Sequence, residues 1–135
     1  MIRTRPLEER EVVLPSGSRL RVPTAAETLR VKAFLVVRRN QTRDYVDVVA
    51  LADRYGIDWS ADVLVRIDDF YVDQHGEGHG VAGQVARQLA DPRPHDVSVT
   101  RQLASYRNLD PRWTDWAEVR STSRDIAAAM LERAV

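Results

Sequence analysis

Residues 23–39 read PTAAETLRVKAFLVVRR and predict the first long helix of the chain. Thr24 and Glu27 have the form of a capping box, in which a hydroxyl and a carboxylate satisfy the free amides at a helix start. Apolar residues then recur at helical spacing, which indicates one buried face. The members of this stripe are Ala26, Leu29, Ala33, Val36 and Val37. We therefore expect a helix over 25–38.

The segments on either side of this helix predict the rest of the fold. Residues 8–14 and 19–22 are β-prone and flank Pro15-Ser16-Gly17-Ser18, so they predict a hairpin. A second helix is expected over 43–55, with an apolar stripe and a glycine stop at Gly56. Later helices are expected over 60–73, capped by Ser60, and over 81–89, 100–106 and 114–133. The predicted fold is mainly α (α+β), with a short N-terminal β-hairpin followed by a helical bundle.

Length and composition limit the class of protein. The 135 residues, 44% hydrophobic and 30% charged, suit one folded domain and exclude a large multidomain enzyme. The chain has no cysteine, so it holds no disulfide and no thiolate metal site. No stretch approaches the ~18 apolar residues of a membrane span. These features predict a cytoplasmic protein with no membrane partner.

The formal net charge of zero is unevenly distributed. Residues 1–43 carry +6, residues 44–79 carry −7 and residues 80–135 carry +1. The sign changes between Arg43 and Asp44. A basic helix is therefore followed directly by an acidic block, unlike the mixed charges of an ordinary surface.

Charged residues at the junction of the first two helices form the main candidate site. Two antiparallel helices joined by a short turn would bring Lys32 or Arg39 close to Asp44 and Asp47. A cation beside two carboxylates can hold a phosphate, help to bind a divalent cation or tune a proton transfer. The alternative is an interhelical network of ion pairs, with Arg43 and Asp47 as an i, i+4 pair.

This region resembles the AbiEii/AbiGii-type nucleotidyltransferase toxins of type IV toxin–antitoxin systems. The family carries a proline entry, a helix with a lysine and then Arg-x-x-x-(Lys/Arg)-Asp-x-x-Asp. The chain has Pro23, Lys32 and Arg39-Asn-Gln-Thr-Arg43-Asp44-Tyr-Val-Asp47. Segments 103–109 and 113–116 are also similar to the tail of some family members.

The resemblance implies Mg²⁺-assisted transfer of a nucleotide from an NTP to RNA, in some relatives the 3′ end of tRNA, and a cognate antitoxin as partner. It implies that Asp44, Asp47 and Lys32 are catalytic, and that Lys32, Arg39 and Arg43 bind the triphosphate. It also divides the chain into residues 1–23, a hairpin from the edge of a nucleotidyltransferase-like core, and residues 24–135, a helical domain.

The chain departs from the family in lacking the Gly-Ser and Asp-x-Asp motif that binds the metals. Gly17-Ser18 leads into a predicted strand and is no substitute. Whether the chain is an enzyme is therefore left open, and no residue is assigned as a metal ligand. We expect a truncated member that contributes part of a site. The alternatives are a non-catalytic module that binds RNA or antitoxin, and a homologue without chemistry.

Three weaker candidates remain. His75 and His79 flank Gly-Glu-Gly and favour a loop over a metal site, because a further fixed ligand is missing. The three tryptophans at 59, 113 and 116 favour core anchors over base-stacking platforms. The aspartates at 68, 69 and 73 favour a solvated helix face.

Overall fold

A computed structural model describes residues 2–72, 80–106 and 108–134 of the chain. It is mainly helical with a short N-terminal β-hairpin, which confirms the predicted fold class. The six helices within the described residues are α1 Ala25–Arg39, α2 Thr42–Tyr55, α3 Ile57–Leu64, α4 Val81–Ala90, α5 Val97–Arg101 and α6 Trp116–Arg133. Three short 3-10 turns join them, η1 Ile67–Asp69, η2 Leu103–Ser105 and η3 Pro111–Thr114.

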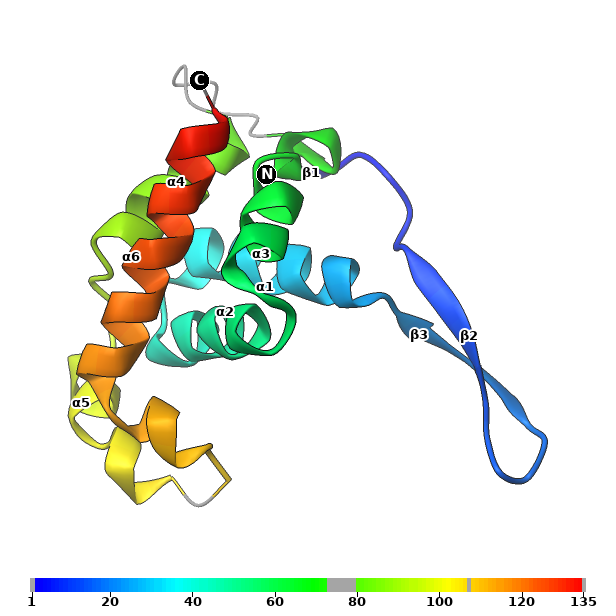
Figure 1. Cartoon of the computed structure of the whole chain (residues 1–135), viewed down its shortest axis with the longest axis horizontal. Helices are drawn as coiled ribbons and strands as arrows, with labels where there is room; N and C mark the ends of the chain where they lie inside the picture. The colour runs from blue at the N-terminus through cyan, green and yellow to red at the C-terminus, as the bar shows by residue number, and fades with distance from the viewer. Residues whose placement is uncertain (1, 73–79, 107, 135) are drawn as a thin grey trace.

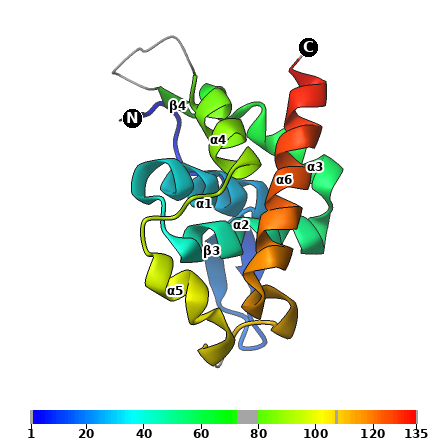
Figure 2. The same cartoon turned by 90° about the vertical axis from the view of Figure 1, so that its left-hand side faces the viewer.

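The helices gather around one hydrophobic core. The long helix α6 packs against α4 and α3, and α1 packs against α2 (Figures 1 and 2). Fully buried side chains come from every long helix and include Leu29, Val36, Val48, Leu64, Leu89 and Ile126. Burial of such side chains stabilises the folded state by roughly 25 cal/mol for each Å² of apolar surface removed from water. The predicted stripe of α1 is confirmed at Leu29, Ala33 and Val36, whereas Ala26 and Val37 are only half-buried.

The predicted hairpin is present as β2 Glu9–Val13 paired antiparallel with β3 Arg19–Pro23. It extends away from the helical body, joined to it at one end (Figure 1). The turn places Gly17 at a φ of 86°, a conformation that a side chain would strain. Most residues of both strands are exposed, so the hairpin contributes little to the core.

A second strand pair was not predicted. Residues Ile2–Arg3 (β1) pair antiparallel with Tyr71–Val72 (β4), which ties the start of the chain to the segment after η1. The Arg3 guanidinium also donates a hydrogen bond to the Tyr71 hydroxyl at 2.8 Å. Two-residue strands carry too short a pattern to be recognised in a sequence.

The predicted helix over 60–73 is wrong at both ends. The helix α3 begins at Ile57 after Gly56, and it ends at Leu64. Ser60 lies inside the helix, buried, and its hydroxyl donates to the Gly56 carbonyl at 2.8 Å. The residues after Leu64 form η1 and β4 instead. A serine that can bond back to a carbonyl four residues earlier is compatible with a helix interior, so it did not mark a start.

The start of α1 has half of the predicted capping box. The Thr24 hydroxyl accepts the Glu27 amide at 3.1 Å, as expected. The Glu27 carboxylate is fully buried and points elsewhere: it pairs with Arg3 at 2.6 Å and with Arg30 at 3.0 Å, and it accepts the Glu8 amide at 3.3 Å. This carboxylate joins the N-terminal strand, the base of the hairpin and α1.

The pKa of Glu27 reflects these contacts. Burial favours the protonated acid, but the hydrogen bonds from Arg3 and Arg30 outweigh it and hold the pKa of Glu27 below its ordinary value of 4.5. A carboxyl whose pKa is lowered on folding stabilises the folded state above its unfolded pKa. The stabilisation is lost as the pH falls from about 4.5 through the lower, folded value.

We predict that Glu27→Gln lowers the free energy of unfolding by about 3 kcal/mol at neutral pH, because it leaves two arginines facing an uncharged group in the interior. Urea denaturation followed by circular dichroism measures this. The variant should also lose less stability than the parent between pH 4.5 and the folded pKa. Glu11→Gln is the control, because Glu11 pairs with Arg19 on the exposed hairpin. An equal effect of both substitutions would contradict the prediction.

Candidate functional site

The candidate residues lie where α1 and α2 meet. Asn40, between the two helices, has a left-handed backbone with a φ of 50°, which asparagine tolerates better than most residues. Its side-chain amide donates to the Arg93 carbonyl at 2.8 Å and its carbonyl oxygen accepts the Tyr45 hydroxyl. The turn is thereby held on both sides, and α1 and α2 run back along each other.

Asp44 is a structural residue of the second helix. Its side chain is 1% exposed; it accepts Arg39 Nη2 at 2.6 Å and the Gln41 amide at 3.4 Å. The Gln41 side chain accepts in return from the Asp44 backbone, which completes a capping box. The hydrogen bond with Asp44 raises the pKa of Arg39 above its ordinary value. Asp44 thus stabilises the start of α2, and its ion pair with Arg39 holds that start against the end of α1.

Asp47 makes a different pair. It lies 3.1 Å from Lys32 Nζ on α1, and both side chains are more than a third exposed. The predicted i, i+4 partner of Asp47 was Arg43, but the lysine of the neighbouring helix takes that place. The predicted proximity of a cation to two carboxylates is thus confirmed, in the form of two separate interhelical ion pairs.

Arg43 is the remaining member of the predicted set. Within residues 2–72, 80–106 and 108–134, its guanidinium has no ion pair or hydrogen bond. It lies instead on the rim of a cavity of about 160 Å³. The other lining residues are Val46, Asp47, Leu103, Tyr106, Asn108 and Leu109.

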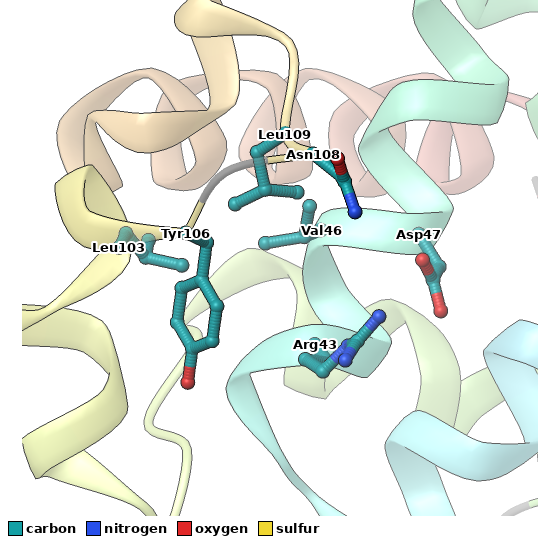
Figure 3. Close-up of a pocket in the computed structure, with 7 residues that line it drawn as sticks. All are labelled: Arg43, Val46, Asp47, Leu103, Tyr106, Asn108 and Leu109. Atoms are coloured by element: carbon teal, nitrogen blue, oxygen red, sulfur yellow. The ribbon is translucent and has the colours of Figure 1, made fainter.

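The cavity has an apolar side and a polar side (Figure 3). Leu103 and Val46 are buried, and with Leu109 they form its apolar wall. The guanidinium of Arg43, the carboxylate of Asp47 and the amide of Asn108 lie together on the opposite side. Sequence reasoning missed the cavity because it brings 43–47 next to 103–109, two segments with no shared motif.

The chain offers no obvious metal centre in its described residues. No group of three or more histidines, aspartates or glutamates there is close enough to hold a metal ion. His75, His79 and Asp73 lie outside the described residues. Asp68, expected on a solvated face, accepts the Val81 amide at 2.6 Å and the Ala82 amide at 3.3 Å, and so caps α4.

The tryptophans support the core, as expected. Trp113 is 3% exposed, and Trp59 and Trp116 are partly buried against the core cluster. The Trp116 ring meets Tyr45 edge-on, with ring centroids 6.1 Å apart.

Comparison with known proteins gives relatives of one kind. The chain is 39% identical over 132 residues to the mycolic acid-containing lipids exporter MmpL11 of Mycolicibacterium smegmatis, which covers 96% of the chain. It is 38% identical to the heme uptake protein MmpL11 of Mycobacterium tuberculosis and 35% identical to the probable transport protein MmpL11 of Mycobacterium leprae, each over 98% of the chain. The match spans only 12–13% of the length of these relatives.

No family model matches the chain, and no solved structure does. Within the described residues, no helix is both long enough and apolar enough to cross a membrane.

The relatives overturn the toxin resemblance. Proteins similar over nearly the whole chain are transport proteins, so the expected nucleotidyltransferase toxin, truncated or not, is wrong. The alternative of an RNA- or antitoxin-binding module falls with it. So do the partners inferred from the resemblance: NTP, an RNA acceptor and an antitoxin. The physical reason is that a lysine, two arginines and two aspartates at this spacing also close an ordinary helical hairpin.

The expectations of a cytoplasmic protein and of no membrane partner are also wrong, because the relatives are named as a lipid exporter, a heme uptake protein and a transport protein. Both expectations had rested on the lack of an apolar stretch. That observation concerns these 135 residues alone and does not exclude work in a larger membrane-bound system. The catalytic and triphosphate roles of Lys32, Arg39, Arg43, Asp44 and Asp47, the Mg²⁺ and the division at residue 23 are tested by none of these findings and stay predictions.

We predict that Asp44→Ala lowers the free energy of unfolding by about 1–2 kcal/mol, the usual cost of a lost helix cap. Asp47→Ala should cost less than about 1 kcal/mol, because it removes only an exposed ion pair. Chemical denaturation of the two variants side by side measures both. If Asp47→Ala were the more harmful, the assignment of Asp44 as the structural residue would be wrong.

Proposed function

We propose that the chain works as a helical domain outside the lipid bilayer, as part of a transport system of the MmpL11 kind. The observation that carries this proposal is the 35–39% identity to three MmpL11 transport proteins over almost all of the chain. The printed names of these relatives describe export of mycolic acid-containing lipids and uptake of heme. On this proposal the chain contributes to such transport, with no nucleotide chemistry of its own.

The surface of α6 supports a position in water. The helix buries Val119, Ile126 and Met130, while its outer side exposes charged residues. These are Glu118, Arg120, Arg124, Asp125 and Glu132. A charged side chain in the middle of a bilayer costs at least ~2.5 kcal/mol, so a helix with this outer face belongs in water or among lipid headgroups.

The hairpin supports attachment to a larger protein. Its register places Val12 opposite Leu20 and Val22 opposite Arg10, so this face is apolar apart from Arg10. The other face carries the cross-strand ion pairs Glu9–Arg21 and Glu11–Arg19. The apolar face is not covered: Leu20 is 50% exposed, and the hairpin extends away from the helices (Figure 1).

A two-stranded hairpin is marginal in water by itself, and an apolar face on it calls for a partner. The matched segment spans only 12–13% of the length of the relatives, so most of such a protein lies outside it. We therefore take the occupant to be the part of an MmpL11-like transport protein outside the matched segment.

A chimera tests the proposed function. The matched segment of the Mycolicibacterium smegmatis exporter is replaced by this chain, and the export of mycolic acid-containing lipids is measured in cells that lack the native gene. We expect export at a level comparable to the parent's, and well above that of an exporter without the segment or with an unrelated helical domain of equal length. The proposal is wrong if the exporter without the segment is fully active, or if a chimera present in the membrane at the parent's level is inactive.

In the same chimera, Leu20→Arg tests the hairpin. Because Leu20 is half exposed, the isolated variant should unfold at the parent's temperature, yet lipid export should fall because the apolar face can no longer dock. Arg21→Ala, on the opposite face, is the control and should change neither. Export unchanged by Leu20→Arg contradicts the docking, as does a dimer of the isolated chain in sedimentation that Leu20→Arg converts to monomer.

A further inference from the structure

The geometry points to a binding site for a small monocarboxylate in the cavity between α2 and the η2–η3 segment, independently of any role in transport. Arg43 would bind the carboxylate, and the wall formed by Val46, Leu103 and Leu109 would take the apolar part. The cavity joins these two features in one place (Figure 3).

The charge of the site follows from the ion pairs around it. Lys32 neutralises Asp47, which leaves the guanidinium of Arg43 as a net single positive charge on the rim. Arginine presents two parallel N–H donors that match the two oxygens of a carboxylate. The same fork can bind phosphate, but a phosphate dianion would bring two negative charges to one positive charge, with no second free cation among the described lining residues. The site therefore favours a monoanion.

The size of the ligand follows from the volume. A cavity of about 160 Å³ is close to the roughly 150 Å³ of an apolar cavity that holds one benzene molecule. The ligand's apolar part is thus one ring or a short acyl end. A heme or a long-chain lipid, the cargo in the relatives' names, is far too large to be enclosed, so this site is distinct from a cargo site.

The neutral polar groups on the rim would help to orient the bound carboxylate. The Asn108 side chain lies on the same side as Arg43 and offers an amide donor to a carboxylate oxygen. Tyr106 also lines the cavity and is 39% exposed. Asn108 and Arg43 come from segments about 65 residues apart, and a shared ligand would hold them together.

Phenylacetate, a carboxylate on one benzene ring, is the probe. The full chain, labelled with ¹⁵N, is titrated with it and followed by amide chemical shifts. We expect saturable changes confined to residues lining the cavity. Arg43→Ala should weaken binding about tenfold, as expected for loss of a charge-assisted hydrogen bond. Arg54→Ala, on the exposed side of the same helix, is the matched control and should leave the affinity unchanged.

Two further probes separate the parts of the site. Phenylacetamide, which keeps the ring but loses the charge, should bind about tenfold more weakly than phenylacetate. Inorganic phosphate should not displace phenylacetate. The inference is overturned if no saturable binding occurs, if the shifted residues lie elsewhere, if Arg43→Ala binds like the parent, if the amide binds as well as the acid or if phosphate competes. Arg43 is exposed, so its replacement leaves the fold intact.

Discussion

The structure depends on one buried carboxylate. Glu27 lies at the point where β1, the base of the hairpin and α1 meet, and it contacts a residue of each. A buried charge is tolerated only when it is paired and hydrogen-bonded, so the two arginines must reach it from the strand and from the helix. The guanidinium of Arg30 also lies over the Phe70 ring, 3.8 Å from its centroid. A single charge therefore ties the N-terminal strand and the base of the hairpin to α1.

The same carboxylate explains why a sequence pattern was only half right. Thr24-Ala-Ala-Glu27 predicted a reciprocal capping box, and the threonine plays its part. The glutamate instead pairs with Arg30, its i, i+3 neighbour on α1, and with Arg3, whose position no local pattern encodes. Helix existence could be predicted from periodicity, because the apolar stripes of α1 and α2 are set by the chain itself. Its ends and its partners depend on tertiary contacts, as Gly56 and Ser60 also show at the start of α3.

For the candidate site, the spacing predicted that the charged residues of α1 and α2 lie close together, but not what they do. A short turn between two helices must bring Lys32 and Arg39 near Asp47 and Asp44, whatever the protein does. The resemblance to a toxin family assigned chemistry to this geometry, although ion pairs with the same spacing close helical hairpins generally. Burial separates the two carboxylates: Asp44 is enclosed and caps α2, whereas the side chain of Asp47 stays more than a third exposed.

Competition for Asp47 links the ion pairs to the cavity. On an isolated helix, Arg43 and Asp47 are i, i+4 neighbours and would neutralise each other. Packing of α1 against α2 offers Lys32 to Asp47 instead, and the guanidinium of Arg43 is left facing the apolar wall formed by Val46, Leu103 and Leu109. The free charge at the cavity is thus a product of tertiary structure. A helix-by-helix interpretation of the sequence would have paired Arg43 with Asp47 and left the cavity without its positive charge.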